Sequence, residues 1–323
     1  MKQPAVSICI PTYNYGKYIG EAIESVLSQT FDDFELVIID DCSDDQTDSV
    51  INKYNVIDKS IRYYRNKNNI GMVNNWNLCL REARGKYVKF LFADDKFVDN
   101  DAVKIMYESL EVNKSAIMAC SARLVIDERS NAINAWSCFT NDSLIDGREM
   151  IKQCILEQRN IIGEPTAVMY RREIGTRGFD PSFRQLVDLE MWLHLLSHGD
   201  LVYFNKPLVA FRQHSKQQSY INSQTTVCLH EMATLSKSYF SNPSGVEKRI
   251  SKSIINYSYR HKIWKSYRNG IMSKIEAHNI IGSLIQRGLF YLNMPLYKVL
   301  NPLFKYAIKS RRTKLSSRKL EVK

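Results

Sequence analysis

The sequence lacks the two commonest loops that bind phosphate groups. Neither G-x-x-x-x-G-K-[ST] nor G-x-G-x-x-G occurs among its 323 residues, which excludes a P-loop and a dinucleotide-binding fingerprint. Internal repeats and low-complexity segments are absent as well. Any chemistry on a phosphate group would therefore have to rest on other side chains.

The seven cysteines form no recognisable pattern. Their number is odd and no C-x-x-C pair occurs, so the sequence predicts neither a zinc site nor a disulfide framework and fits a reducing cytoplasm. Nowhere do about 18 uncharged apolar residues follow one another, so no transmembrane helix is predicted. The first apolar run, Val6 to Ile10, is too short for a signal peptide and is expected to form a strand.

Positive charge is concentrated at one end of the chain. The net charge is +11, and apolar residues make up 44% of the sequence, enough for a substantial core. Residues 224–323 contain 19 Lys and Arg against four Glu, a charge of +15, whereas the first 223 residues carry −4. We therefore expect a domain of residues 1–220 followed by a helical, basic region of residues 221–323. Such a tail favours contact with an anionic membrane or a nucleic acid.

Strand and helix signals alternate through the first hundred residues. Apolar runs at 6–11, 34–39, 61–64 and 87–92 are typical of strands, and apolar residues at helical spacing lie between them. This alternation predicts an α/β fold with a mostly parallel central sheet flanked by helices. Ser43 and Asp146 are predicted to cap helices. Residues 201–211 are predicted to form a final pair of strands, with Pro207 at an edge or turn.

Two of the predicted strands end in paired aspartates. Asp40-Asp41 follows one and Asp94-Asp95 the other, and buried parallel strands present functional side chains at their C-terminal ends. Neighbouring carboxylates raise each other's pKa unless a cation lies between them, so Asp94-Asp95 predicts a divalent metal beside a phosphate. At the first pair, a carboxylate can accept the N–H of a pyrimidine base. The alternative is that these aspartates only cap helices.

Several segments resemble the inverting glycosyltransferases of family 2. The segments that keep the order and spacing of that family are Val6–Asn14, Ser25–Thr30, Glu35–Asp45 and Asn69–Gly71. The resemblance covers residues 5–219, which makes 1–220 the catalytic domain, and implies a glycosyltransferase-A (Rossmann-like) fold, a nucleotide-sugar donor, with UDP as the default, and a Mn²⁺ or Mg²⁺ ion. By position, Pro11, Thr12 and Asp40 would line the base. Asp94 and Asp95 would bind the metal, and Asp94 would also contact the donor.

Two positions depart from the pattern of this family. Phe92 stands where the first aspartate of a D-x-D motif is common, and Asn75-Trp76-Asn77 replaces the common Ala-Arg-Asn. One carboxylate contact to nucleotide or metal is therefore missing.

The segment Asp188-Leu189-Glu190-Met191-Trp192 resembles the E-D-x-D-x-W motif of the same family, with Val187 in place of the leading Glu. On a helix, Asp188 and Glu190 lie about 200° apart, whereas Asp188 and Trp192 lie one turn apart on the same side. Asp188 is therefore predicted to be the general base that takes a proton from the acceptor hydroxyl. An exposed pair of helical acids is the alternative.

Phe211-Arg212-Gln213-His214 resembles the end of the family's catalytic domain. Arg212 is predicted to contact the donor diphosphate and His214 the metal, although a lone histidine after a strand is more often structural. Arg65 is a weaker candidate for the diphosphate, with a solvated charge as its alternative. The segment 163–166 falls where acceptor loops occur, and the sequence assigns it no role.

The tail combines an apolar segment, Gly288–Ile308, with the basic cluster Lys309–Lys314. This combination predicts a peripheral contact with an anionic membrane, and the alternative is a helical appendage packed on the catalytic domain. The chain is thus expected to transfer a sugar to a growing glycan, on a lipid carrier, at the cytoplasmic face of the membrane and without binding nucleic acid. The alternatives are a sugar nucleotidyltransferase and a non-catalytic membrane scaffold, which Phe92 and Val187 would suit.

Overall fold

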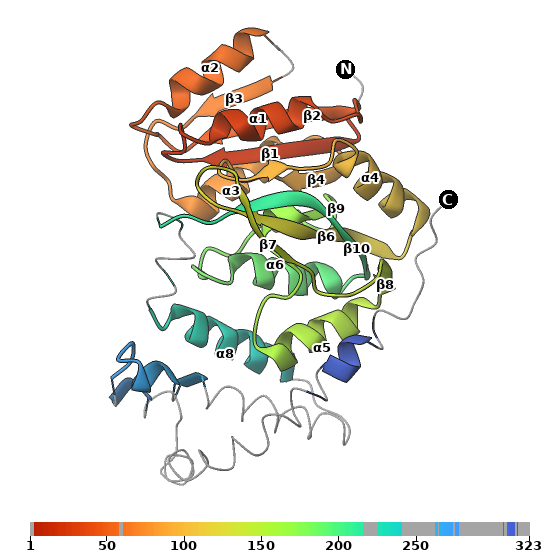
Figure 1. The fold of residues 1–323 in the computed structure, drawn as a ribbon, viewed down its shortest axis with the longest axis vertical. Helices are drawn as coiled ribbons and strands as arrows, with labels where there is room; N and C mark the ends of the chain where they lie inside the picture. Colours follow the sequence, from red (N-terminus) through yellow and green to blue (C-terminus); the bar gives the residue numbers. More distant parts are fainter. Residues whose placement is uncertain are drawn as a thin grey trace.

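The computed structural model describes residues 3–57, 61–215, 217, 222 and 225–240, and further along 262, 263, 265–273, 275–277, 306, 309–313 and 315. A ten-stranded sheet forms the centre of this part of the chain, with helices against its faces (Figure 1). The strand order is β3-β2-β1-β4-β9-β6-β10-β5, while β7 pairs with β6 and β8 with β10. The predicted α/β fold with a mostly parallel sheet is confirmed.

The first four strands are parallel and are joined by helices. They are β1 (Val6–Thr12), β2 (Phe34–Asp40), β3 (Ile61–Arg65) and β4 (Tyr87–Phe90), with α1 (Ile19–Leu27), α2 (Thr47–Ile57) and α3 (Met72–Glu82) between them. Every residue of β1 and of β4 is buried. Strands covered on both faces are apolar throughout rather than alternating, which is why these segments are recognisable in the sequence.

Strand directions are mixed in the second half of the sheet. β6 (Ala116–Ile126) and β10 (Asp200–Arg212) are parallel to each other, whereas β9 (Val168–Arg171) lies between β4 and β6 and is antiparallel to both. The remaining elements are β5 (Lys96–Phe97), β7 (Ala132–Trp136), β8 (Ser143–Ile145), α4 (Ala102–Val112), α5 (Gly147–Glu157), the 3₁₀ helix η1 (Pro165–Ala167), α6 (Val187–Leu196) and α8 (Val227–Phe240).

Three local predictions can be compared with this structure. Asp146 caps α5 as predicted, because its side chain accepts a hydrogen bond from the Glu149 N–H at 3.0 Å. The prediction for Ser43 is wrong: α2 begins at Thr47, and the Ser43 hydroxyl donates to the carboxylate of Asp40 instead. The predicted strand pair is the single strand β10, whose register shifts on either side of Pro207 because proline has no N–H for the ladder.

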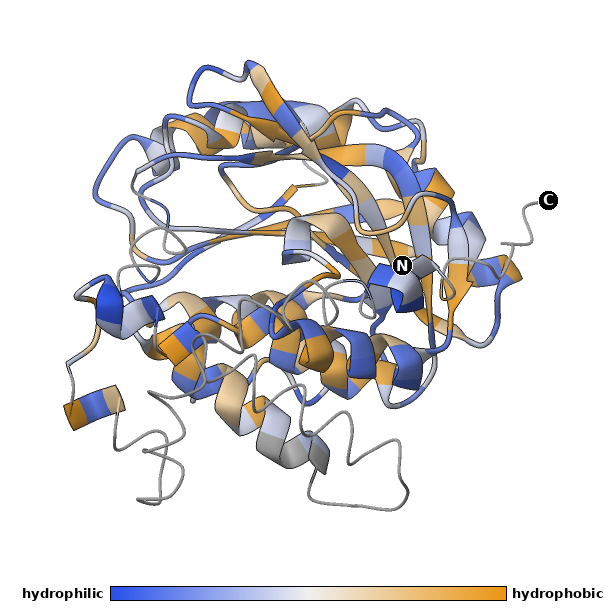
Figure 2. Cartoon of the chain, turned by 60° about the horizontal axis from the view of Figure 1, so that its bottom comes forward, coloured by the Kyte–Doolittle hydropathy of each residue, from blue (hydrophilic) through white to orange (hydrophobic). Residues whose placement is uncertain are grey.

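The core lies in two apolar layers, one on each face of the sheet. One layer is formed with α1 and α4, and the other with α3, α5 and α6. Figure 2 shows hydrophobic and hydrophilic residues alternating along the helices, as expected for helices with one face on a core and the other in solvent. Among the residues that the structure describes, none of the helices combines the length and apolarity needed to cross a bilayer.

The core continues past the boundary that we expected at residue 220. Met232 and Leu235 of α8 are buried in the same apolar layer as α5 and α6. Arg311 and Arg312 of the predicted basic cluster form ion pairs with Glu149 and Glu157 of α5. These two arginines therefore pack against α5. Apart from Tyr306, the apolar segment 288–308 that was predicted to meet a membrane lies outside the described residues.

Candidate active site

The ends of several strands meet at one edge of the sheet. β1, β2, β3, β4, β6 and β10 all finish there, and β9, which runs the other way, begins there. The residues that follow β4 and β10 are therefore brought next to the residues that precede β9. This edge gathers most of the side chains that the sequence singled out.

Thr12 and Asp40 lie opposite each other at the ends of β1 and β2. Both are buried, and neither Thr12 Oγ1 nor Asp40 Oδ2 has a hydrogen-bond partner among the described residues. Arg65 Nε lies 3.4 Å from Asp40 Oδ2, and burial raises the pKa of Asp40. Buried polar atoms are nearly always paired in folded proteins, so two such atoms side by side indicate a place for a polar ligand.

Asp41, by contrast, has a structural task. Its two carboxylate oxygens accept hydrogen bonds from the N–H groups of Ile70 and Gly71 at 2.8 and 2.9 Å. It thereby fixes the Asn69-Ile70-Gly71 turn at the start of α3. Gly71 has a φ of 87°, a conformation that glycine adopts without strain.

Asp94 and His214 face each other across the same edge. His214 Nε2 lies 3.0 Å from Asp94 Oδ2, and Gln217 Nε2 lies 3.4 Å from the same oxygen. The His214 ring packs against the rings of Tyr15 and Tyr18 at 5.8 and 5.4 Å between centroids. Neither Tyr15 nor Gln217 was predicted from the sequence to belong to the site.

Asp95 is held by the protein on both sides of its carboxylate. Oδ1 accepts the N–H of Arg212 at 2.9 Å, and Oδ2 accepts the Thr166 hydroxyl at 2.5 Å. Burial, followed by the neighbouring charge of Asp94, raises the pKa of Asp95 well above its usual value. Asp95 is 1% exposed, and both of its carboxylate oxygens have protein partners.

The side chain of Arg212 is surrounded by hydrogen-bond acceptors of the protein. It is fully buried, and its guanidinium donates to the carbonyls of Asp94 and Asp127, to Ser130 and to Glu21. The predicted direct contact with the donor therefore disagrees with this geometry, because the guanidinium is occupied by protein partners. Arg212 instead fixes the backbone on which Asp94 stands.

A divalent metal fits this edge in part. Within the described residues, no three His, Cys, Asp or Glu side chains come together as metal ligands. The carboxylate of Asp94 and the imidazole of His214 nevertheless provide an oxygen and a nitrogen 3.0 Å apart, ligand types that suit Mn²⁺. Phosphate oxygens of a bound donor would have to supply further ligands.

Asp188 and Glu190 point in different directions on α6, as helical spacing predicts. Arg177 holds Glu190 through two hydrogen bonds of 2.8 and 2.9 Å. Asp188 is half-buried, and its Oδ2 accepts a hydrogen bond from Asn160 Nδ2 at 2.8 Å. Burial raises the pKa of Asp188 to about 7, a value suited to a general base near neutral pH.

One short segment connects Asp188 with the aspartate pair. At its start, Asn160 contacts Asp188, and at its end Thr166 contacts Asp95. Between them, the Gly163 carbonyl accepts hydrogen bonds from Asn160 and from the Trp192 indole, at 2.9 and 2.8 Å. Segment 160–166 therefore links Asp188 to Asp95 through hydrogen bonds at its two ends.

Besides Tyr15 and Gln217, three further features of this site were not predicted from the sequence. Asn160 carries no motif, and the fully buried Lys89 lies in an apolar run, where its Nζ donates to the carbonyls of Phe90 and Thr166. Phe92, noted only as a missing aspartate, packs on Trp76 with ring centroids 4.8 Å apart. A charged residue inside an otherwise apolar strand was the signal that could have identified Lys89.

Comparison with known proteins places this geometry in context. Residues 7–176 match the model of the family described as glycosyl transferase family 2. TuaG of Bacillus subtilis (strain 168), named as a putative teichuronic acid biosynthesis glycosyltransferase, is 29% identical over 211 residues, which cover 65% of this chain and 79% of TuaG.

Two solved structures share the fold over nearly the whole chain. S. aureus TarS 1–349 in complex with UDP-GlcNAc has a TM-score of 0.66 and 19% identity, covering 96% of this chain and 89% of that one. The mannosyltransferase PcManGT of Pyrobaculum calidifontis, in complex with GDP-Man and Mn²⁺, has a TM-score of 0.52 and 13% identity, covering 98% and 87%. At these identities, the likeness concerns the fold alone.

Proposed function

The chain belongs to glycosyltransferase family 2 and has the glycosyltransferase-A fold, and we propose that it transfers a sugar, with inversion, from a UDP-sugar to a hydroxyl of a bacterial surface glycan. The observation that carries the proposal is the 160–166 segment. It joins the candidate base, Asp188, to the aspartates at the end of β4. The general base Asp188 and the departing nucleoside diphosphate would thus lie on opposite sides of the reacting sugar.

The residues divide the chemistry between them. Thr12 and Asp40, whose buried Oγ1 and Oδ2 atoms accept no hydrogen bond from the described residues, would bind the nucleotide base beside Pro11. Arg65, next to Asp40, borders the same place. Asp94 and His214 would hold a Mn²⁺ or Mg²⁺ ion, which when bound would neutralise the charge of the diphosphate.

Asp188 would accept the proton of the acceptor hydroxyl while that oxygen attacks the anomeric carbon. The bond from this carbon to the diphosphate oxygen breaks on the opposite side, so the configuration inverts. Asn160 donates a hydrogen bond to the Asp188 carboxylate and so favours its ionised form. Arg212 donates a hydrogen bond to the Asp94 carbonyl and Thr166 donates one to the Asp95 carboxylate, and these bonds would hold the two aspartates in position.

The similar proteins support the class of substrate. TuaG is named for the synthesis of teichuronic acid, TarS was solved with UDP-GlcNAc and PcManGT with GDP-Man and Mn²⁺. These names favour a nucleotide-diphosphate donor and a polysaccharide acceptor. A lipid-linked acceptor at the cytoplasmic face of the membrane, and a peripheral membrane contact by the basic tail, belong to the same proposal.

The test is a donor panel. Purified full-length protein with Mn²⁺ is given UDP-, dTDP- and GDP-sugars, and the release of nucleoside diphosphate is followed with and without EDTA. We expect release from one UDP-sugar that chelation abolishes. Release of pyrophosphate from a nucleoside triphosphate and a sugar phosphate would instead indicate a nucleotidyltransferase.

The non-catalytic scaffold is the second candidate, and Phe92 at the position of the first D-x-D aspartate is the observation that favours it. A scaffold would bind none of the donors in a calorimeter and release no diphosphate. Binding of one donor, followed by turnover, contradicts this candidate.

A further inference from the structure

Helix α6, which carries Asp188, begins without a cap from its own segment. Its N-cap residue is Leu186, which makes no side-chain capping hydrogen bond. Backbone N–H groups at the start of a helix lack partners within the helix and need an acceptor from elsewhere. The N–H groups just before the helix, from Arg184 to the N-cap residue Leu186, find their acceptor in a distant part of the chain.

Glu231 of α8 supplies the missing acceptor. Its Oε1 accepts the N–H of Arg184 at 2.6 Å, while its Oε2 accepts the N–H groups of Gln185 and Leu186 at 3.0 and 2.7 Å. A carboxylate at the N-terminal end of a helix is also favoured by the helix dipole. One side chain of the C-terminal region thereby fixes three consecutive backbone positions that end two residues before Asp188.

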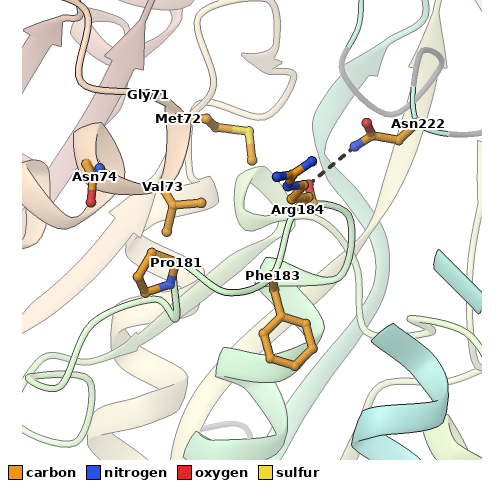
Figure 3. A pocket seen from close by; sticks show the side chains of 8 residues that line it. All are labelled: Gly71, Met72, Val73, Asn74, Pro181, Phe183, Arg184 and Asn222. Carbon is orange, nitrogen blue, oxygen red and sulfur yellow. Dashed lines mark hydrogen bonds between the residues drawn. The ribbon is translucent and has the colours of Figure 1, made fainter. Parts of the chain in front are cut away.

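The same loop forms one wall of a cavity of about 350 Å³. The cavity is lined by Gly71, Met72, Val73 and Asn74 of the α3 start and by Pro181, Phe183, Arg184 and Asn222 (Figure 3). It therefore lies between the start of α3, which Asp41 anchors, and the loop that leads to Asp188. Asn222 ties the loop further by donating to the Arg184 carbonyl at 3.3 Å.

We propose that Glu231 is a positioning residue that builds the acceptor side of the active site from α8, by holding Asp188 and the wall of a cavity that receives an acceptor sugar. The cavity offers apolar surface from Met72 and Pro181 for the C–H face of a pyranose, and polar groups from Asn74 and Arg184 for its hydroxyls. The inference rests on the proposed function, in which Asp188 is the base. The hydrogen bonds of Glu231 within the described residues all go to this loop.

The test compares Glu231→Ala and Glu231→Gln with a control, Glu276→Ala. Glu276 also lies beyond residue 220, carries the same charge, and contacts the backbone and hydroxyl of its near neighbour Ser273. Hydrogen exchange reports on the amides of residues 184–189, calorimetry measures the affinity for UDP, and turnover is measured with the donor that the panel selects.

In Glu231→Ala we expect exchange at residues 184–189 to quicken about tenfold or more. Turnover should fall about 10- to 100-fold, since a displacement near 1 Å is enough for such a loss. UDP affinity should stay within about twofold. Glu231→Gln keeps one accepting oxygen and should recover a large part of the turnover, and Glu276→Ala should match the wild type.

Two results would overturn the proposal. Unchanged exchange at residues 184–186 in Glu231→Ala would show that the cap does not hold the loop. Faster exchange with wild-type turnover would show that the loop does not position the base. Failure of the proposed function itself is a separate result, in which Asp188→Asn keeps full turnover while the Glu231 variants lose it.

Discussion

The ring of Phe92 lies against the ring of Trp76, with centroids 4.8 Å apart and planes inclined by 32°. Both residues are departures from the family pattern, one in place of an aspartate and the other in place of an arginine. The two departures are therefore in direct contact and form one aromatic pair. Trp76 also meets Phe179 edge-on at 5.2 Å, so the pair continues into the core.

This contact predicts that substitutions at Phe92 and Trp76 have non-additive effects on the free energy of unfolding. Phe92→Asp alone should lower the free energy of unfolding by about 2 to 4 kcal/mol, because an aromatic contact is lost and a carboxylate is placed against an indole. In a Trp76→Arg background the same change should cost at least about 1 kcal/mol less, since the two new side chains can pair. Urea unfolding of the four proteins measures both values. Equal costs in the two backgrounds would contradict the coupling.

Asp188→Asn should remove the base without removing the binding site. Loss of a general base typically costs 10²- to 10⁴-fold in rate, while UDP affinity should stay within about twofold. Glu190→Gln is the matched control, because Glu190 lies on the same helix but is held by Arg177. Steady-state turnover and calorimetry on the two variants separate the roles. An equal loss in both variants would point to damage of the helix rather than to catalysis.

The rate should rise with pH through the neutral range. Burial raises the pKa of Asp188 to about 7, and only the ionised carboxylate can accept a proton. Asn160→Ala removes a hydrogen bond to this carboxylate and should move the acidic limb of kcat/KM upward by about one pH unit, as expected for a bond to a charged group. Glu164 and Cys228, whose negative charges interact with that of Asp188, are unchanged in this variant. Asn134→Ala, on the exposed strand β7, should leave the limb unmoved.

Lys89 should make stability depend on pH in the alkaline range. Burial lowers the pKa of Lys89 to about 7, whereas the unfolded chain keeps a value of about 10.4. Between these values the unfolded state binds more protons, so this lysine makes the protein more stable as pH rises. Tyrosines and cysteines with raised pKa values act in the opposite direction, so the test is the difference between the wild type and Lys89→Met. That difference should change between about pH 7 and 10, and a constant difference in urea unfolding would refute the prediction.

Arg311 and Arg312 should contribute to folding rather than to membrane binding. Their ion pairs with Glu149 and Glu157 are partly shielded from solvent, and a double-mutant cycle on Arg312 and Glu157 should give a coupling of about 1 kcal/mol. In flotation with anionic vesicles at low salt, the double variant Arg311→Ala, Arg312→Ala should behave like the wild type. Loss of flotation in this variant alone would assign the two arginines to the lipid contact. A wild type that stays in the soluble fraction would remove the membrane proposal.

The parallel half of the sheet could be predicted because its strands are covered on both faces. An uninterrupted apolar run such as β1, followed by apolar residues at helical spacing, is typical of a buried parallel strand. β10 was harder to predict, since Pro207 is typical of a strand edge or a turn and in fact lies at a shift of register inside one long strand. A proline reports a missing N–H but does not reveal whether the chain turns there.

Site residues that directly follow a strand could be predicted from the sequence. Site residues that depend on contacts with distant parts of the chain could not. Asp40, Asp94 and His214 lie at or just after strand ends and could be selected from the sequence. Asn160 and Glu231 act through backbone groups and carboxylates far away in the chain, a relationship that no local pattern encodes. Arg212 is the converse case, because its motif suggested a ligand contact, while its guanidinium donates to groups of the protein itself.

Strand β9 begins at the edge of the sheet where its neighbours β4 and β6 end. The connection from α5 to β9, residues 158–167, therefore arrives at this edge, where its residues Ile161, Ile162 and Ala167 are part of the buried core. Because its residues Asn160 and Thr166 contact Asp188 and Asp95, a change in the length of this connection would change the spacing of these two carboxylates. A loop from a related chain that replaces this connection would have to keep Asn160 and Thr166, because these residues form the hydrogen bonds to Asp188 and Asp95.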